Sequence, residues 1–134
     1  MAERHFTVEE ANELLPTVRP LVENMVAHRK ALSAAVEREE QLTATIAGNG
    51  GGLPPQELAD VQAEIEREAG EIARCIDGIQ ELGVLVKDLD SGLVDFPALR
   101  QGLEVLLCWR LGEDEIRYWH ELEEGFAGRK ELPL

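Results

Sequence analysis

The apolar residues of this chain change their spacing at Gly83, and that change limits the folds the chain can adopt. Before Gly83 they recur every three or four residues, as on one face of an α-helix. After Gly83 they alternate with polar residues, as in strands with one buried face. The 134 residues therefore predict a single α+β domain over 1–134. We expect a long, coiled-coil-like antiparallel helical hairpin followed by a small antiparallel β-meander of three to four strands.

The helical half begins at Thr7, which can form a capping box with Glu10. Pro16 and Pro20 each remove a helical hydrogen bond, so we expect a short segment at about 8–15 and a long helix at about 17–47. A loop at 47–56 contains four glycines. The second helix is predicted to end near Gly83, a glycine that can adopt the left-handed conformation common just after a helix. The hairpin is thus predicted over about 7–82.

The short loop also predicts which helical residues face each other. Pairing Ile46 with Leu58 makes residues 6–19 extend past the second helix, so we expect them to fold back onto the sheet. Some positions of the facing stripes are polar, and together with one cysteine they form a weak metal-site candidate. These candidates are His28, Glu39, Glu68 and Cys75, with Cys75 opposite His28. The alternative to a metal site is an irregular helix–helix contact whose polar residues are half-exposed and bind nothing.

Glycine-containing turns divide the second half into strands at about 84–89, 93–98, 103–111 and 116–122. The last of these could instead be helical, and 123–134 is predicted to be an irregular tail. Pro97 indicates an edge or a bulge late in the second strand. The alternation predicts one face packed on the hairpin, with Leu85, Val94, Phe96, Val105, Leu107, Trp109, Ile116, Tyr118, His120 and Leu122.

The opposite, polar face of the sheet is the best candidate ligand site. It combines carboxylates, guanidinium groups that can grip an anion, and an aromatic ring. The candidates are Asp88, Asp95, Arg110, Arg117, Trp119 and Glu121. The alternatives are cross-strand ion pairs on a solvated face or an oligomer interface. His120 is a further weak metal candidate, although counting places it on the core face.

Charge and cysteine content exclude several classes of protein. The formal net charge of −14 disfavours nucleic acids and anionic membranes, whose phosphates are bound by basic residues. No apolar run is long enough for a membrane span or a signal peptide. Cys75 and Cys108 have no metal-binding spacing, and we interpret them as reduced thiols of a cytoplasmic protein.

Several segments together resemble a known family. They are 83–90, 92–97, 107–113, 119–121 and 125–129, with Phe6-Thr7, Glu10–Asn12 and Leu15-Pro16 near the start. Over essentially the whole chain they resemble the uncharacterised bacterial domain-of-unknown-function family 2203. The resemblance implies a bacterial cytosolic protein and supplies no activity, so no catalytic residue is carried over.

The sequence leaves open whether the protein is an enzyme and requires no cofactor. The first hypothesis is that the protein is a non-enzymatic structural or protein-interaction domain. Because a two-helix hairpin buries only one stripe of each helix, we expect a homodimer or higher homo-oligomer. The alternative is a protein that binds a small anion or a divalent metal on the polar face of the sheet, which could be an enzyme.

Overall fold

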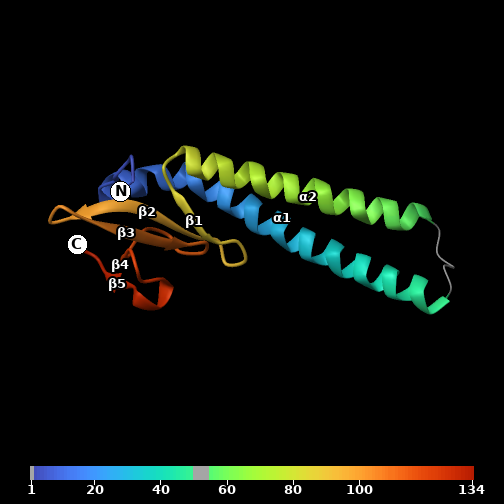
Figure 1. Ribbon diagram of the computed structural model, residues 1–134. Coiled ribbons are helices and arrows are strands. Elements are labelled where there is room, and N and C mark those ends of the chain that lie inside the picture. Colours follow the sequence, from blue (N-terminus) through green and yellow to red (C-terminus); the bar gives the residue numbers. More distant parts are fainter. Residues whose placement is uncertain (1, 50–54) are drawn as a thin grey trace.

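Two helices and a five-stranded antiparallel sheet make up this α+β protein (Figure 1). The computed structural model describes residues 2–49 and 55–134. Helix α1 spans Val8–Asn49 and α2 spans Pro55–Glu81, and they run antiparallel as a rod that projects from the sheet. The predicted helical hairpin and meander are confirmed. The middle of the predicted loop, residues 50–54, lies outside the described residues.

Helix α1 is continuous, so the predicted separation at Pro16 and Pro20 is wrong. Both prolines are exposed, and water can satisfy the carbonyl groups that they leave without a partner. Meanwhile the opposite side of the helix is fully packed at Leu15, Val18 and Val22. Tertiary burial therefore holds the helix together where local propensity would end it.

Both predicted helix-end signals are present. The Thr7 hydroxyl accepts the Glu10 amide at 3.1 Å, while the Glu10 carboxylate accepts the Thr7 amide at 2.9 Å. At the end of α2, Gly83 has φ +87° and donates to Gln80, and the Val84 amide donates to the Ile79 carbonyl. These two bonds are a Schellman motif, which turns the chain directly into the sheet.

The facing of the helices differs from the prediction at His28. Its expected neighbour was Cys75, but His28 Nδ1 lies 2.5 Å from Glu68 Oε2. The predicted pairing was deduced from the loop, and the observed contacts of α1 are displaced from it along α2 towards the loop. One such contact is Leu21, whose side chain packs over Gly78.

The strands follow one another in the sheet in chain order, β1-β2-β3-β4-β5. Their bounds are Leu85–Asp88, Leu93–Arg100, Leu103–Arg110, Tyr118–Glu121 and Lys130–Glu131. The fourth element is therefore a strand. The tail is not irregular throughout, because it contains the 3-10 turn η1, Phe126–Gly128, and the short strand β5. A two-residue strand is too short to show alternation in sequence.

Strand β4 has its faces exchanged relative to the prediction. Trp119 is paired with Leu107 and belongs to the main core, whereas His120 is paired with Leu106 on the other face. Residues 111–117 form an extended turn with no strand pairing, so counting through them moved the register by one. A shift of one residue moves every side chain to the opposite face.

Two other predicted core residues are exposed, namely Leu85 (37%) and Leu122 (53%). Val84 takes the core position at the start of β1, because the Schellman turn directs its side chain inward. Leu122 follows the last paired residue of β4 and leaves the sheet. The inward alternation therefore begins one residue earlier than predicted in β1 and ends before Leu122.

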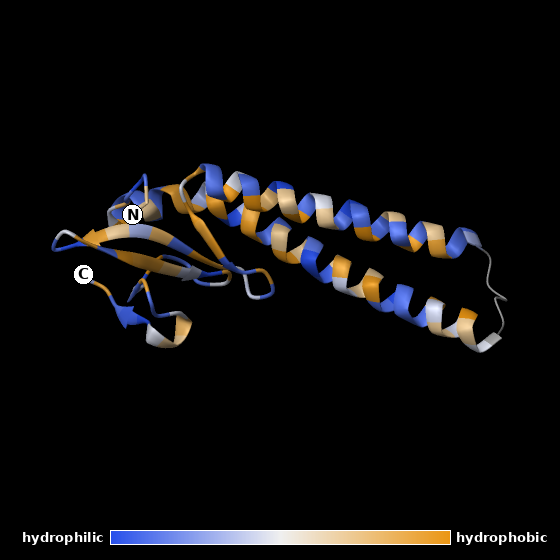
Figure 2. Ribbon diagram, viewed as in Figure 1, coloured by the Kyte–Doolittle hydropathy of each residue, from blue (hydrophilic) through white to orange (hydrophobic). Residues whose placement is uncertain are grey.

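The first two turns of α1 lie against the sheet, as the overhang of 6–19 predicted. The Phe6 amide donates to the Pro97 carbonyl at 2.7 Å, and Asn12 accepts the Ile116 amide at 2.8 Å. Pro97 lies beyond the last residue paired with β1, so its missing N–H breaks no ladder bond on that side of β2. Hydrophobic residues are concentrated at this junction (Figure 2). Neither helix has an apolar stretch sufficient to span a membrane within the described residues.

Candidate functional site

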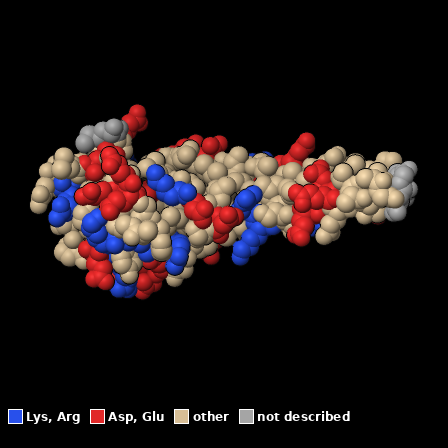
Figure 3. Space-filling model, turned by 60° about the horizontal axis from the view of Figure 1, so that its bottom comes forward, with Lys and Arg blue, Asp and Glu red and all other residues tan. Residues whose placement is uncertain are grey.

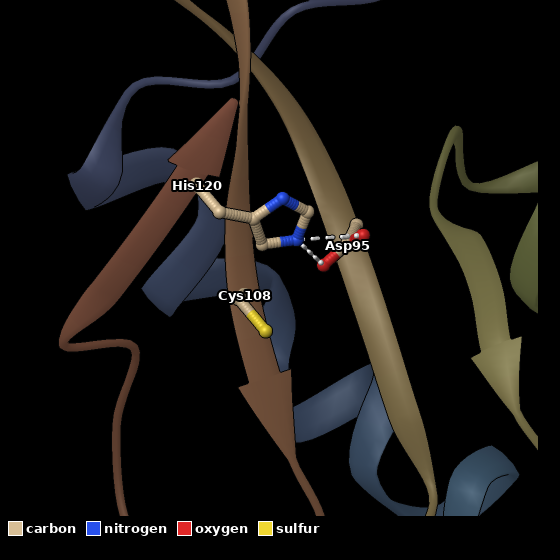
Figure 4. A group of neighbouring side chains, drawn as sticks. All are labelled: Asp95, Cys108 and His120. Carbon is tan, nitrogen blue, oxygen red and sulfur yellow. Dashed lines mark hydrogen bonds and ion pairs between the residues drawn. The ribbon is translucent and has the colours of Figure 1, made fainter. Parts of the chain in front are cut away.

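Three side chains that can bind a metal converge on the face of the sheet opposite the helices. Asp95 comes from β2, Cys108 from β3 and His120 from β4 (Figure 4). Asp95 and Cys108 are direct cross-strand partners, and His120 lies diagonally across from Cys108. One ligand atom from each of the three residues lies within 4.8 Å of the others. We call this group the Asp–Cys–His cluster.

The cluster is buried although it lies outside the main core. Asp95, Cys108 and His120 are only 1%, 0% and 2% exposed. Polar groups in such a position need partners, because desolvation without hydrogen bonds costs several kcal/mol (roughly 2–7). The partners within the cluster therefore determine its chemistry.

The hydrogen bonds of His120 fix the state of its ring. Nδ1 donates a proton to the Glu121 carbonyl oxygen at 2.8 Å. Nε2 faces both carboxylate oxygens of Asp95 at 3.1 Å. Because Nδ1 must carry a proton, the proton between Nε2 and Asp95 is the one that can be exchanged. An imidazole held through Nδ1 by a carbonyl is the usual arrangement of a metal-binding histidine.

Burial raises the pKa of both acidic members of the cluster. The pKa of Asp95 lies above its ordinary value because burial outweighs the opposing influence of His120. Burial likewise raises the pKa of the Cys108 thiol to about 11, against the effect of Arg129. A thiol of this kind is protonated at neutral pH and is a poor nucleophile. The cluster therefore does not resemble a cysteine-based catalytic site.

Arg129 covers the cluster from the C-terminal segment. Its Nε donates to Cys108 Sγ at 3.4 Å, and one Nη donates to the Cys108 carbonyl at 3.2 Å. The two Nη atoms also grip Glu113 at 2.6 and 2.9 Å. Burial alone would raise the pKa of Glu113, but the bonds from Arg129 and the Arg110 amide hold it below its ordinary value.

The predicted polar-face residues are dispersed, and only Asp95 belongs to the cluster. Asp88 accepts the Ser91 amide and hydroxyl in the turn after β1. Arg117 pairs with Asp114 and Glu115 on the surface.

The other predicted polar-face residues point elsewhere. Arg110 is exposed and stacks over the Phe126 ring at 4.6 Å. Trp119 is buried on the helix face between Arg100 and Lys130. Glu121 is exposed on that same face, and only its carbonyl contacts the cluster, through His120. The exchanged face of β4 explains the positions of Trp119 and Glu121.

The hairpin candidates do not form a comparable group. His28 and Glu68 bond each other, Cys75 is buried, and Glu39 is half-buried. In residues 2–49 and 55–134, the Asp–Cys–His cluster is the one group of three potential ligands with this spacing. Of the predicted metal candidates, only His120 belongs to it.

Cys108, Glu113 and Arg129 were not among the predicted site residues. The alternation that places Phe96, Leu107 and Trp109 on the core face also places Asp95 and Cys108 together on the other face, and this was the available signal. His120 was assigned to the opposite face, which concealed the cluster. The ion pair between Glu113 and Arg129 joins a turn to the tail, and no periodicity marks such a contact.

A family model described as "Uncharacterized conserved protein (DUF2203)" matches residues 4–132. Because the match covers nearly the whole chain, the chain belongs to this family. Comparison with curated proteins and with solved structures found no match.

Proposed function

Within this family of uncharacterized conserved proteins, we propose that the chain binds one divalent transition-metal ion, of the zinc class, at the Asp–Cys–His cluster. One observation carries the proposal: three unlike ligands converge while the His120 ring already has its Nδ1 proton committed to a carbonyl. The Glu121 carbonyl and Asp95 would satisfy a packing histidine, but packing does not require a buried thiol beside them as a third potential ligand.

The ligand types indicate which ions fit. Thiolate and imidazole are preferred by zinc and its neighbours, whereas magnesium and calcium require mostly oxygen ligands. Zinc bonds of about 2.0–2.3 Å place two ligand atoms of a tetrahedron about 3.5 Å apart. In the cluster, His120 Nε2 lies 3.1 Å from the Asp95 oxygens and all three ligand atoms lie within 4.8 Å of one another, so side-chain shifts of about 1 Å would reach this geometry. One coordination position remains for a fourth ligand.

The charges of such a site also balance. A divalent ion with the Asp95 carboxylate, the Cys108 thiolate and neutral His120 has no net charge. Burying a neutral group is far less costly than burying an isolated ion. In the metal-free protein, the buried Cys108 thiol keeps its proton at neutral pH. Ion binding therefore replaces protons, as thiol ligands generally require.

Burial of the ligands favours a structural or regulatory ion over a catalytic one. A catalytic ion needs a position open to substrate, and all three side chains are covered. We further propose a cytoplasmic location, where both free cysteines stay reduced.

The proposal is tested by metal analysis and thermal unfolding of purified protein. We expect one zinc or cobalt ion per chain and a raised melting temperature. An ion at a hundred times its Kd stabilises by about 2.7 kcal/mol. Cys108→Ala and His120→Ala should abolish both effects, whereas the matched control Cys75→Ala should retain them. Absence of a bound ion and of any shift with zinc, cobalt or nickel would contradict the proposal.

A second function, self-association through the hairpin, is favoured by its thin packing far from the sheet. Within 31–48 and 55–71, Ala35 and Val61 are the buried residues, and Leu42 and Ile65 are only half-buried. A groove of about 560 Å³ opens there, and Leu42 and Val61 contribute to its lining. Figure 3 shows acidic side chains gathered in a band across the rod, with uncharged surface beside it.

We propose that a second copy covers this stripe in a four-helix arrangement. Light scattering at micromolar concentration should give a dimer mass, and Leu42→Glu should give a monomer with an unchanged sheet. A wild-type monomer under these conditions would contradict self-association and leave the metal proposal intact.

A further inference from the structure

We propose that residues 123–132 form a strap over the metal site, and that an ion enters or leaves only when Arg129 releases Glu113. This inference rests on the proposed metal-binding function and concerns its regulation. The strap comprises the turn after β4, η1 and β5. It is the segment that brings a side chain onto the Cys108 sulfur.

Arg129 is held more firmly than any other side chain of the strap. Its guanidinium group lies between the rings of Tyr118 and Phe126, at 4.3 and 4.5 Å from their centroids. It also donates to Glu113 through both Nη atoms, and the two side chains are only 11% and 20% exposed. A partly buried, bidentate ion pair is among the stronger polar contacts in proteins. We therefore treat the Arg129–Glu113 ion pair as the contact that holds the strap closed.

Glu113 is a rigid anchor because it is tied to the sheet. Its carboxylate accepts the Arg110 amide at 2.7 Å, and its carbonyl accepts the indole Nε1 of Trp109 at 3.0 Å. Trp109 is completely buried in the main core. The Arg129–Glu113 ion pair thus joins an exposed segment to the buried core of the sheet.

Between Glu123 and Ala127 the strap is weakly attached, whereas its far end is held at Leu132, whose amide donates to the Arg117 carbonyl at 2.9 Å and whose side chain packs against the core. Residues 123–127 are exposed, and β5 adds only two paired residues to the edge of the sheet. The Lys130–Glu124 ion pair is also exposed, at 43% and 36%, and exposed pairs contribute little to stability. Opening of the strap is consequently limited by Arg129, while the sheet beneath it stays folded.

A closed strap should affect the rates of ion uptake and release more than the equilibrium affinity for the ion. The ligand atoms belong to β2, β3 and β4, so the strap supplies none of them. Loosening it should speed both uptake and release of the ion. The equilibrium affinity should then change much less than either rate, which distinguishes a gate from a lost ligand.

Cobalt binding and its transfer to a chelator provide the first test, on the full chain. Glu113→Gln keeps an oxygen for the Arg110 amide but loses the ion pair, and Arg129→Lys loses the forked contact. Charge-assisted contacts of this type correspond to about a tenfold to hundredfold change in an equilibrium. We expect both rates to rise by about that factor in each variant. Lys130→Gln, in the same strap, is the matched control and should exchange cobalt as the wild type does.

A metal-free measurement separates the strap from the metal proposal. In a Cys75→Ala background, Cys108 is the one remaining thiol, and its reaction with a small thiol reagent reports opening of the strap. Glu113→Gln should accelerate this reaction at the same pH and in the absence of denaturant, where the variant is still folded. Unchanged thiol reactivity and unchanged cobalt rates would overturn the strap even if the ion binds. A wild-type chain that binds no ion would overturn the metal proposal, and with it the control of ion exchange by the strap.

Discussion

The two ends of this molecule both carry an apolar helix stripe but are held together differently. Where α1 meets the sheet, Ala11, Leu15, Val18 and Met25 are all buried, and two exposed prolines do not break the helix. In the far part of the hairpin, no described residue of α1 beyond Ala35 is buried. An apolar stripe thus determines which face of a helix packs inward. How much that face stabilises the protein depends on how completely other elements bury it.

The largest contrast is expected between core substitutions at the two ends. Trp109→Ala removes a fully buried ring from the sheet end and should lower the free energy of unfolding by about 3–5 kcal/mol. Leu42→Ala, on the half-buried far stripe, should cost less than about 1 kcal/mol in the monomer. Denaturant unfolding with chelator present measures both. Equal losses would contradict the difference between the ends.

Alkaline pH should weaken the sheet end through Cys108. Its pKa is about 11 in the folded protein against 9.0 as the ordinary value, so the folded chain keeps a proton that the unfolded chain loses. This contribution is complete below pH 9 and is lost as the pH rises towards 11. It amounts to about 3 kcal/mol for a shift of this size. The difference in unfolding free energy between wild type and Cys108→Ala, measured without metal, gives the slope, and a difference independent of pH would refute it.

Two glycine substitutions should act with opposite sign. Gly92 has φ +71°, and an added Cβ would lie 2.9 Å from atoms of Val22 and Leu111, so Gly92→Ala should destabilise by about 1–3 kcal/mol. Gly70 lies within α2 with only an Arg74 side-chain atom near its added Cβ, at 3.7 Å. Gly70→Ala should therefore stabilise by up to about 1 kcal/mol. Melting temperatures that shift in the same direction would contradict this reading.

The smallest effect on stability is expected at Arg110, next to the residue with the largest expected effect. Arg110 follows Trp109 in the chain, but its side chain is exposed and only stacks on Phe126. Arg110→Ala should change the free energy of unfolding by no more than about 0.5 kcal/mol. A loss comparable with that of Trp109→Ala in the same denaturation assay would show that the Phe126 contact is part of the core.

Much of the fold could be predicted because its signals are local. Thr7 and Glu10 lie within one helical turn, and positive φ at Gly83, Gly92 and Gly102 is a property of each turn by itself. The candidate site was harder to predict, because it depends on which residues of separate strands become neighbours. Asp95 and Cys108 were on the correct common face, but the unpaired stretch before β4 displaced His120 from it.

The helical hairpin, the start of the sheet and the turns between β1, β2 and β3 can be predicted from the amino-acid sequence, since each follows from the spacing or backbone freedom of nearby residues. Three features depend on the folded chain, namely the continuation of α1 through Pro16 and Pro20, the meeting of His120 with Asp95 and Cys108, and the position of Arg129 over them. One cause explains all three. Burial and cross-strand register depend on contacts between distant parts of the chain, and these contacts outweigh what any short segment prefers.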